Sequence, residues 1–176
     1  VLPSEDLRAK DASAKVGVRR SLEEGSSQCN EYIHCTKSPV AATYYTAAFR
    51  PMGTSARVVK IDLSQLRASS VLDVSTTQKC MDAGLASGSV AHVFAVGHSV
   101  VLLSEPVPPS AIVAIYDVSW YRDLPRGEQH SCSLQQYSDK IPKPLLSEIQ
   151  GWAGPTTVKK LPSWWDLFHM PLRHLW

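Results

Sequence analysis

A period of two in hydrophobicity marks the strands that this chain is expected to form. Along residues 56–63, Val59, Ile61 and Leu63 fall on one face, which is typical of a β-strand with one buried side. Residues 100–103 are continuously apolar and predict a strand that is buried on both faces. Shorter apolar runs predict three further strands, at residues 31–36, 71–74 (an edge strand) and 112–116.

Helical periodicity is weaker and is confined to short segments. Ser38-Pro39 places a capping residue directly before a proline, which is typical of a helix start. Ser89 is a second candidate cap, and the run after it puts Val90, Val93 and Phe94 on one face. Weaker helix signals lie at residues 16–24 and 145–152. Because strands dominate and helices are short, the pattern predicts an α+β fold and not a doubly wound parallel sheet.

The composition of the chain changes near residue 118. Six of the 12 prolines and all five tryptophans fall in residues 119–176. We therefore divide the chain into a core domain, residues 1–118, and a Pro/Trp-rich C-terminal extension, residues 119–176, that we expect to pack on the core. The alternative is that the tryptophans dock on a partner or at a membrane interface.

Composition and charge exclude several classes of protein. Hydrophobic residues make up 44% and charged residues 19% of the 176 residues, which supports a packed core and excludes wholesale disorder. The net charge is 18 − 16 = +2, too balanced to indicate a nucleic-acid-binding protein. No apolar run approaches the ~18 residues that cross a bilayer, so no transmembrane segment is predicted. The sequence starts at Val1, and we expect a processed or trimmed chain.

Motifs for the common chemistries are missing from the sequence. It has no Walker loop, GxGxxG, HExxH or GxSxG pattern. The even cysteine count permits two disulfides, but no CxxC pair exists, so we expect no metal site. The cysteines are Cys29, Cys35, Cys80 and Cys132. His34 lies in the middle of a predicted strand, where a histidine is more often a core residue than a catalyst.

Three stretches follow one another in an order that is more specific than any single motif. They are Tyr32-Ile33-His34-Cys35-Thr36-Lys37-Ser38-Pro39, residues 56–64 together with 71–75, and residues 101–112 with their Pro108-Pro109 pair. This order resembles the ADP-ribosyltransferase fold, in particular the arginine-serine-glutamate class of toxin-like transferases. The resemblance covers residues 1–118. It implies two split sheets, rich in antiparallel pairs, around a cleft that binds NAD.

The resemblance also implies an NAD pocket on the first of these stretches. His34-Cys35-Thr36 stands where the family has Ser-Thr-Ser, and an Ala- and Tyr-rich helix follows it. On this reading the NAD-binding candidates are His34, Cys35, Thr36 and Tyr44. His34 is also a catalytic candidate, because histidine acts near the sugar in other branches of the fold.

The catalytic glutamate of the family falls at Val100 in this sequence. The nearest carboxylate, Glu105, follows the predicted strand on a turn and is the second catalytic candidate. The family's phosphate-binding arginine should stand just before Val1, and Arg8, Arg19 and Arg20 fit that role less well.

Two functions from different classes follow. The preferred one is a degenerate ADP-ribosyltransferase-like domain, a pseudoenzyme that acts as a binding or interaction module for a protein partner. The alternative is an active NAD-dependent mono-ADP-ribosyltransferase or NAD glycohydrolase of toxin or effector type, which the resemblance would make a secreted or delivered protein. A 2′-phosphotransferase, a third NAD-using relative, would need an arginine–histidine spacing that this sequence does not show.

Overall fold

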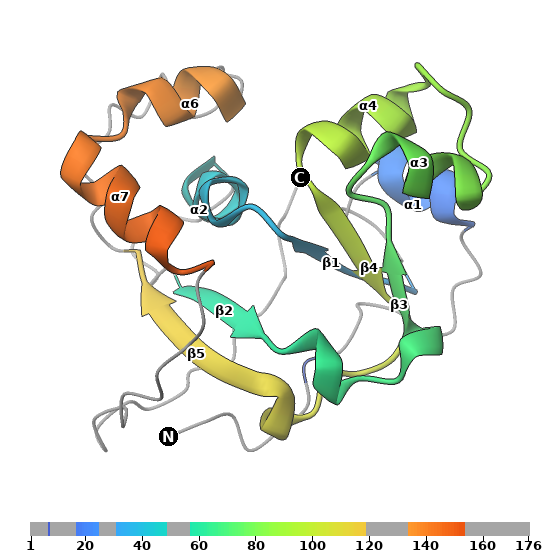
Figure 1. Cartoon of the computed structure of the whole chain (residues 1–176), viewed down its shortest axis with the longest axis horizontal. Helices are drawn as coiled ribbons and strands as arrows, with labels where there is room; N and C mark the ends of the chain where they lie inside the picture. The colour runs from blue at the N-terminus through green and yellow to red at the C-terminus, as the bar shows by residue number, and fades with distance from the viewer. Residues whose placement is uncertain (1–6, 8–16, 25–30, 49–56, 119–133, 154–176) are drawn as a thin grey trace.

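The computed structural model describes residue 7 and residues 17–24, 31–48, 57–118 and 134–153 (Figure 1). The strands are β1 (Ile33–Thr36), β2 (Arg57–Ile61), β3 (Val71–Asp73), β4 (Val100–Leu103) and β5 (Ile112–Asp117). The α-helices are α1 (Val18–Glu24), α2 (Pro39–Ala48), α3 (Thr77–Asp82), α4 (Val90–Gly97), α6 (Leu134–Lys140) and α7 (Lys143–Gly151). Short 3-10 helices are η2 (Leu63–Gln65), η3 (Ala68–Ser70) and η4 (Pro109–Ala111).

The strands form two small antiparallel sheets. The first has the order β1-β4-β3, and the second pairs β2 with β5. Figure 1 shows α1, α3 and α4 gathered on one side of the first sheet, and α6 and α7 beside α2. The α+β class is therefore confirmed, and β3 is an edge strand, as predicted.

β4 lies at the centre of the first sheet and is buried on both faces, as its continuous apolar run predicts. Val101 and Leu103 belong to an apolar cluster that also contains Ile112 and Ile115 of β5. On the opposite face, Val100 and Leu102 pack in a second cluster, whose other buried members are Leu22, Val74, Cys80, Leu85, Ala91 and Ala95. The first cluster packs the two sheets together, and the second packs helices on the first sheet.

The apolar positions of the predicted strands give six expected core residues, and all six lie in the cluster between the sheets. Val101, Leu103 and Ile115 are buried, and the remaining three are half-buried against them: Ile33, Val59 and Ile61. Alternation along the strands is sufficient to identify these residues, because the side chains of every second strand residue point to the same face of the sheet.

Both predicted helix caps are confirmed. The Ser38 hydroxyl accepts a hydrogen bond from the Ala41 N–H at 3.2 Å, and α2 begins at Pro39. The Ser89 hydroxyl accepts one from the His92 N–H at 3.2 Å and starts α4. Each cap satisfies an N–H group that has no partner inside the helix.

The valine face of α4 is exposed to solvent and does not face the core. Ala91 and Ala95 are fully buried, whereas Val90 and Val93 are 71% and 61% exposed. The small alanines allow α4 to lie close against its neighbours α1 and α3 and against β4. Val90 and Val93 are left outside, whereas Val96 packs partly buried against the core.

The described part of the extension packs on the core. Tyr137 of α6, Ile149 of α7 and Ile141, which lies between the two helices, form a cluster with Val118. The Trp152 ring stacks on a tyrosine ring of β5, Tyr116, with centroids 4.2 Å apart and planes inclined by 10°. The amphipathic piece predicted at residues 164–168 lies outside the described residues. Among the residues that the structure describes, no helix is long and apolar enough to cross a membrane.

Candidate functional site

His34 faces the helix-covered side of the first sheet. Its Nε2 lies 2.9 Å from the hydroxyl oxygen of Ser21 on α1. Burial lowers the pKa of His34 from 6.5 to about 4, because the charged imidazolium would lose its hydration there. The ring is therefore neutral at physiological pH and is held between a strand and a helix, in a position that suits a packing role.

Cys35 points to the opposite face of the same strand and pairs in register with Val101. Burial raises the pKa of the Cys35 thiol to about 12, so at neutral pH it is not the thiolate that attacks electrophiles or binds metals. Cys35 and the buried Cys80 are free thiols, and Cys29 and Cys132 lie outside the described residues.

Metal-ligating side chains do not converge in the described ranges. Neighbouring strand residues point to opposite faces, so His34 and Cys35 cannot bind the same ion. Over residues 7, 17–24, 31–48, 57–118 and 134–153 there is no group of three or more histidine, cysteine, aspartate or glutamate side chains that could hold one.

Thr36 joins three elements at the end of β1. Its hydroxyl donates to the backbone oxygen of His98 at 2.6 Å and accepts from the Ser38 N–H at 2.9 Å. These bonds connect the strand to the start of α2 and to the end of α4. The hydroxyl expected to support a nicotinamide pocket is therefore used within the fold.

The position of the family's glutamate lies in the core. Val100 pairs with Thr36 and is 3% exposed. Glu105 follows the other end of β4, where its half-exposed carboxylate lies 3.6 Å from an Arg67 guanidinium nitrogen. The structure does not bring Glu105 to His34, which pairs with Leu102 inside the strand.

The arginines considered for phosphate binding have other partners. Arg19 and Arg20 lie on the outer side of α1, where they form ion pairs with Glu23 at 2.8 Å and Glu24 at 2.6 Å. Such pairs, one turn apart on a helix, are typical of a solvated helix surface. Arg8 lies outside the described residues.

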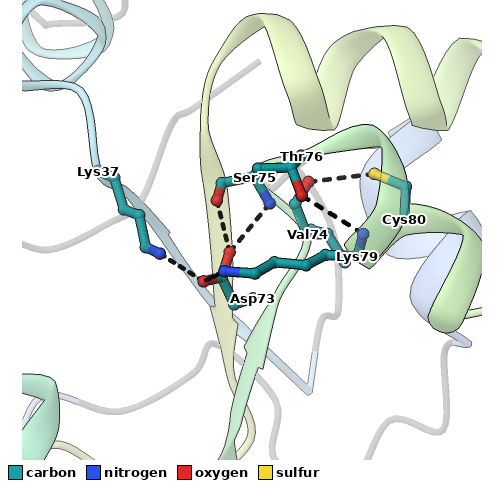
Figure 2. Close-up of polar contacts among 7 residues, drawn as sticks. All are labelled: Lys37, Asp73, Val74, Ser75, Thr76, Lys79 and Cys80. Atoms are coloured by element: carbon teal, nitrogen blue, oxygen red, sulfur yellow. Dashed lines mark hydrogen bonds and ion pairs between the residues drawn. The ribbon is translucent and has the colours of Figure 1, made fainter.

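Sequence reasoning missed a charged cluster centred on Asp73 of β3 (Figure 2). Lys37, which follows β1, and Lys79 of α3 both form ion pairs with one carboxylate oxygen of Asp73, the Lys79 pair at 2.5 Å. Ser75 donates its N–H and its hydroxyl to the other oxygen, at 3.0 and 2.6 Å. Burial acts to raise the pKa of Asp73, but these donors outweigh it and hold the pKa below its usual range.

The position of this cluster could be found only from the strand register. Asp73 pairs with Val101, the residue after Val100, so an ionised carboxylate lies on the strand next to the position of the missing glutamate, although Val100 points to the opposite face of the sheet. Lys37 is 36 residues away in the sequence. The sequence signals available were an acidic residue inside the predicted strand 71–74 and a lysine directly after His34-Cys35-Thr36.

An aromatic cluster surrounds His98, which follows α4. The ring stacks on Phe94 with centroids 4.7 Å apart, and its Nδ1 lies 2.7 Å from the Tyr45 hydroxyl. Burial raises the pKa of Tyr45 and lowers that of His98. Tyr44, a predicted NAD-binding residue, packs edge to face on Tyr137 of α6, with centroids 5.4 Å apart.

The surface beside this cluster is hollowed between α4 and α6. The hollow has a volume of about 550 Å³ and is open to solvent. Its wall is mainly apolar and includes Val90, Val93, Phe94, His98, Leu134 and Gln135. We call this hollow the α4–α6 groove. The described residues that line it present apolar and aromatic groups, and none of them carries a charged side chain, so the groove suits an apolar ligand.

Comparison of the chain with protein families, with curated proteins and with solved structures finds no match in any of the three.

Proposed function

We propose that this chain is a degenerate ADP-ribosyltransferase-like domain that acts as a binding module. The observation that carries the proposal is the environment of Val100. The family needs a carboxylate at this position to stabilise the sugar cation that forms when the nicotinamide–ribose bond breaks. Here the position holds a 3%-exposed valine in an apolar cluster. A valine carries no charge and no hydrogen-bonding group, so it cannot perform that step.

The other residues expected at the site support the same function. His34 bonds with Ser21, and the Thr36 hydroxyl bonds with His98 and Ser38. Each side chain thus already has a partner inside the fold, and a nicotinamide ring would have to displace it. The residues of this strand therefore do not fit NAD as the resemblance expects.

The α4–α6 groove supplies the binding surface of the proposed module. The part of the wall that the structure describes is mainly apolar and has no charged side chain, which favours apolar and aromatic side chains of a polypeptide over a phosphate-bearing ligand. We therefore propose an aromatic peptide segment as the ligand class.

NAD titration and an activity assay test the loss of chemistry. Calorimetric titration of the full chain with NAD should give no binding heat, and labelled NAD should give no transfer to protein, nucleic acid or water. Glu105→Ala and His34→Ala variants run beside the wild type, with an active transferase as positive control. Robust wild-type transfer that disappears in either variant would overturn the proposal.

A second function is favoured by one observation, the ionised carboxylate of Asp73 on β3, the strand that pairs with β4 next to Val100. In an active transferase or glycohydrolase, this carboxylate would replace the missing glutamate. Two lysines already neutralise it, which weakens its attraction for a sugar cation. Asp73→Asn and the surface control Asp82→Asn separate the two functions. NAD consumption that is lost in Asp73→Asn and kept in Asp82→Asn would establish the enzyme.

A further inference from the structure

The exposed valines of α4 give the α4–α6 groove an apolar surface that another apolar segment could bury. Val90 and Val93 are 71% and 61% exposed, and both line the groove. The opposite face of α4 is buried through Ala91 and Ala95. A helix that is apolar on all sides is normally covered on all sides. Binding of an apolar segment in the groove would therefore bury this exposed apolar surface.

The same chain carries a segment with the matching composition. The structure describes the chain as far as Ala153, and 176 − 153 = 23 residues follow. The last 16 of them, residues 161–176, contain one acidic and one basic side chain, Asp166 and Arg173. Nine of the 16 are large and apolar: Leu161, Trp164, Trp165, Leu167, Phe168, Met170, Leu172, Leu175 and Trp176.

We propose that residues 161–176 bind in the α4–α6 groove of their own chain, with the Trp164-Trp165 pair against Phe94 and His98. The inference rests on the proposed function in one respect, that the groove is the binding surface of the module. It adds the identity of the ligand, which is a covalently attached aromatic segment.

The groove chemistry favours a tryptophan. One ring nitrogen of His98, Nδ1, is bonded to Tyr45, and the structure gives the other, Nε2, no hydrogen-bond partner among the described residues. The indole N–H is a donor that needs an acceptor when it is buried. In the tautomer whose Nδ1–H donates to the Tyr45 hydroxyl oxygen, Nε2 is an acceptor. A tryptophan in the groove can then donate to Nε2 while its ring packs on Phe94 and the exposed valines.

The length of the chain permits this contact. Residues 154–160 are seven residues, which span up to roughly 25 Å when extended. A domain of this size has a radius of gyration of only about 16 Å. α6, which begins at Leu134 and forms one wall of the groove, is followed by α7, after which the segment leaves. Attachment raises the effective concentration of the segment to about the millimolar range, so weak contacts suffice.

A photo-crosslink in the full chain tests the contact directly. Val93 is replaced by the photoreactive residue p-benzoylphenylalanine, and the same replacement at Gln150, an exposed residue of α7, is the control. Irradiation of the Val93 variant should give crosslinks to residues 161–176, and the Gln150 variant should give at most a tenth as many. A mixture of ¹⁵N-labelled and unlabelled chains distinguishes crosslinks within one chain from those between chains. Crosslinks between chains, or none to residues 161–176, would overturn the inference.

Hydrogen exchange gives a second measurement that does not depend on the photoreactive residue. Replacing Trp164 and Trp165 together by serine should speed amide exchange in α4 about fivefold or more, since a loss of ~1 kcal/mol corresponds to a factor of about five. Exchange in α7 should stay unchanged and serves as the internal control. Unchanged exchange in α4 would overturn the inference. NAD titration of the same samples reports on the proposed function separately, so its failure is distinguishable from failure of this contact.

Discussion

β4 and α4 are neighbours in the sequence, and both are almost entirely apolar, yet the fold uses them in opposite ways. Only His98 and Ser99 separate them, and Ser99 turns the chain with a φ of 52°. Every residue of β4 is at most 3% exposed, whereas α4 leaves Val90 71% exposed. Apolar composition alone therefore does not decide burial.

The difference comes from the number of covered sides. β4 has a strand on each side and apolar clusters on both faces. α4 contacts β4, α1 and α3 on its alanine side, while its valine side lines the groove. A region closed on all sides leaves no room for a substrate. The site that the resemblance implies falls in this closed region, whereas the binding surface that we propose lies in the open region.

The largest effect is expected when the family's carboxylate is restored, in Val100→Glu. A carboxylate without a partner at this buried position should reduce the free energy of unfolding by about 3–5 kcal/mol. Chemical denaturation measures this loss, and the variant should gain no transferase activity.

Val90→Glu is the matched control, because the same substitution falls on the open face of α4. Only the contact with the docked segment is lost there, so the cost should stay below about 2 kcal/mol. Equal costs at the two positions would contradict the distinction between the regions. A stable Val100→Glu protein that transfers ADP-ribose would show that the closed region is a working site.

The next effect concerns pH and the buried His34. Its pKa is lowered from 6.5 to about 4, so the unfolded chain binds a proton at a pH where the folded chain does not. The contribution of neutral, buried His34 to the free energy of unfolding is therefore fully present above pH 6.5. It is lost as the pH falls from 6.5 towards 4. Its full size is on the order of 3 kcal/mol.

His34→Gln removes the titrating group and keeps a side chain that can bond with Ser21. Unfolding free energies measured at pH 7, 6, 5 and 4.5 should fall less steeply in this variant than in the wild type. His98 also has a lowered pKa and remains, so part of the slope should persist. Identical slopes would show that the His34 ring is exposed to water.

Much of the fold could be predicted from the sequence, because strand alternation and helix caps are local signals. All five strands lie where the apolar runs place them, and Ser38 and Ser89 cap their helices. α3 and α6 were missed. Both are short and rich in polar residues, such as Gln78 and Gln135, so their apolar periodicity is weak.

The candidate site was less predictable, because it depends on contacts that are distant in sequence. The period of two places His34 and Thr36 on one face, but it does not say whether helices or solvent cover that face. Likewise, nothing local connects Lys37 to Asp73, which come together only because β1 and β3 flank β4. Helical spacing correctly placed Val90 and Val93 on one face, but it could not say that this face points outward.

The smallest effect distinguishes two histidines of the α4 region, His92 and His98. The His92 Nδ1 accepts a long bond from the Gly88 N–H at 3.3 Å, so Nε2 carries the hydrogen. That Nε2 is buried and has no hydrogen-bond partner among the described residues. His92→Met removes this unsatisfied donor, and methionine is also the better helix former. The free energy of unfolding should therefore rise by up to about 1 kcal/mol.

His98→Met is the matched substitution and should act in the opposite direction. It removes the 2.7 Å bond to Tyr45 and the stacking on Phe94, at a cost of about 1–2 kcal/mol. Thermal unfolding of the two variants and the wild type at pH 7.5 measures both changes. A loss of stability in His92→Met as large as that in His98→Met would mean that the His92 ring also makes a stabilising contact. The unsatisfied His92 Nε2 would then not explain a difference in stability between the two variants.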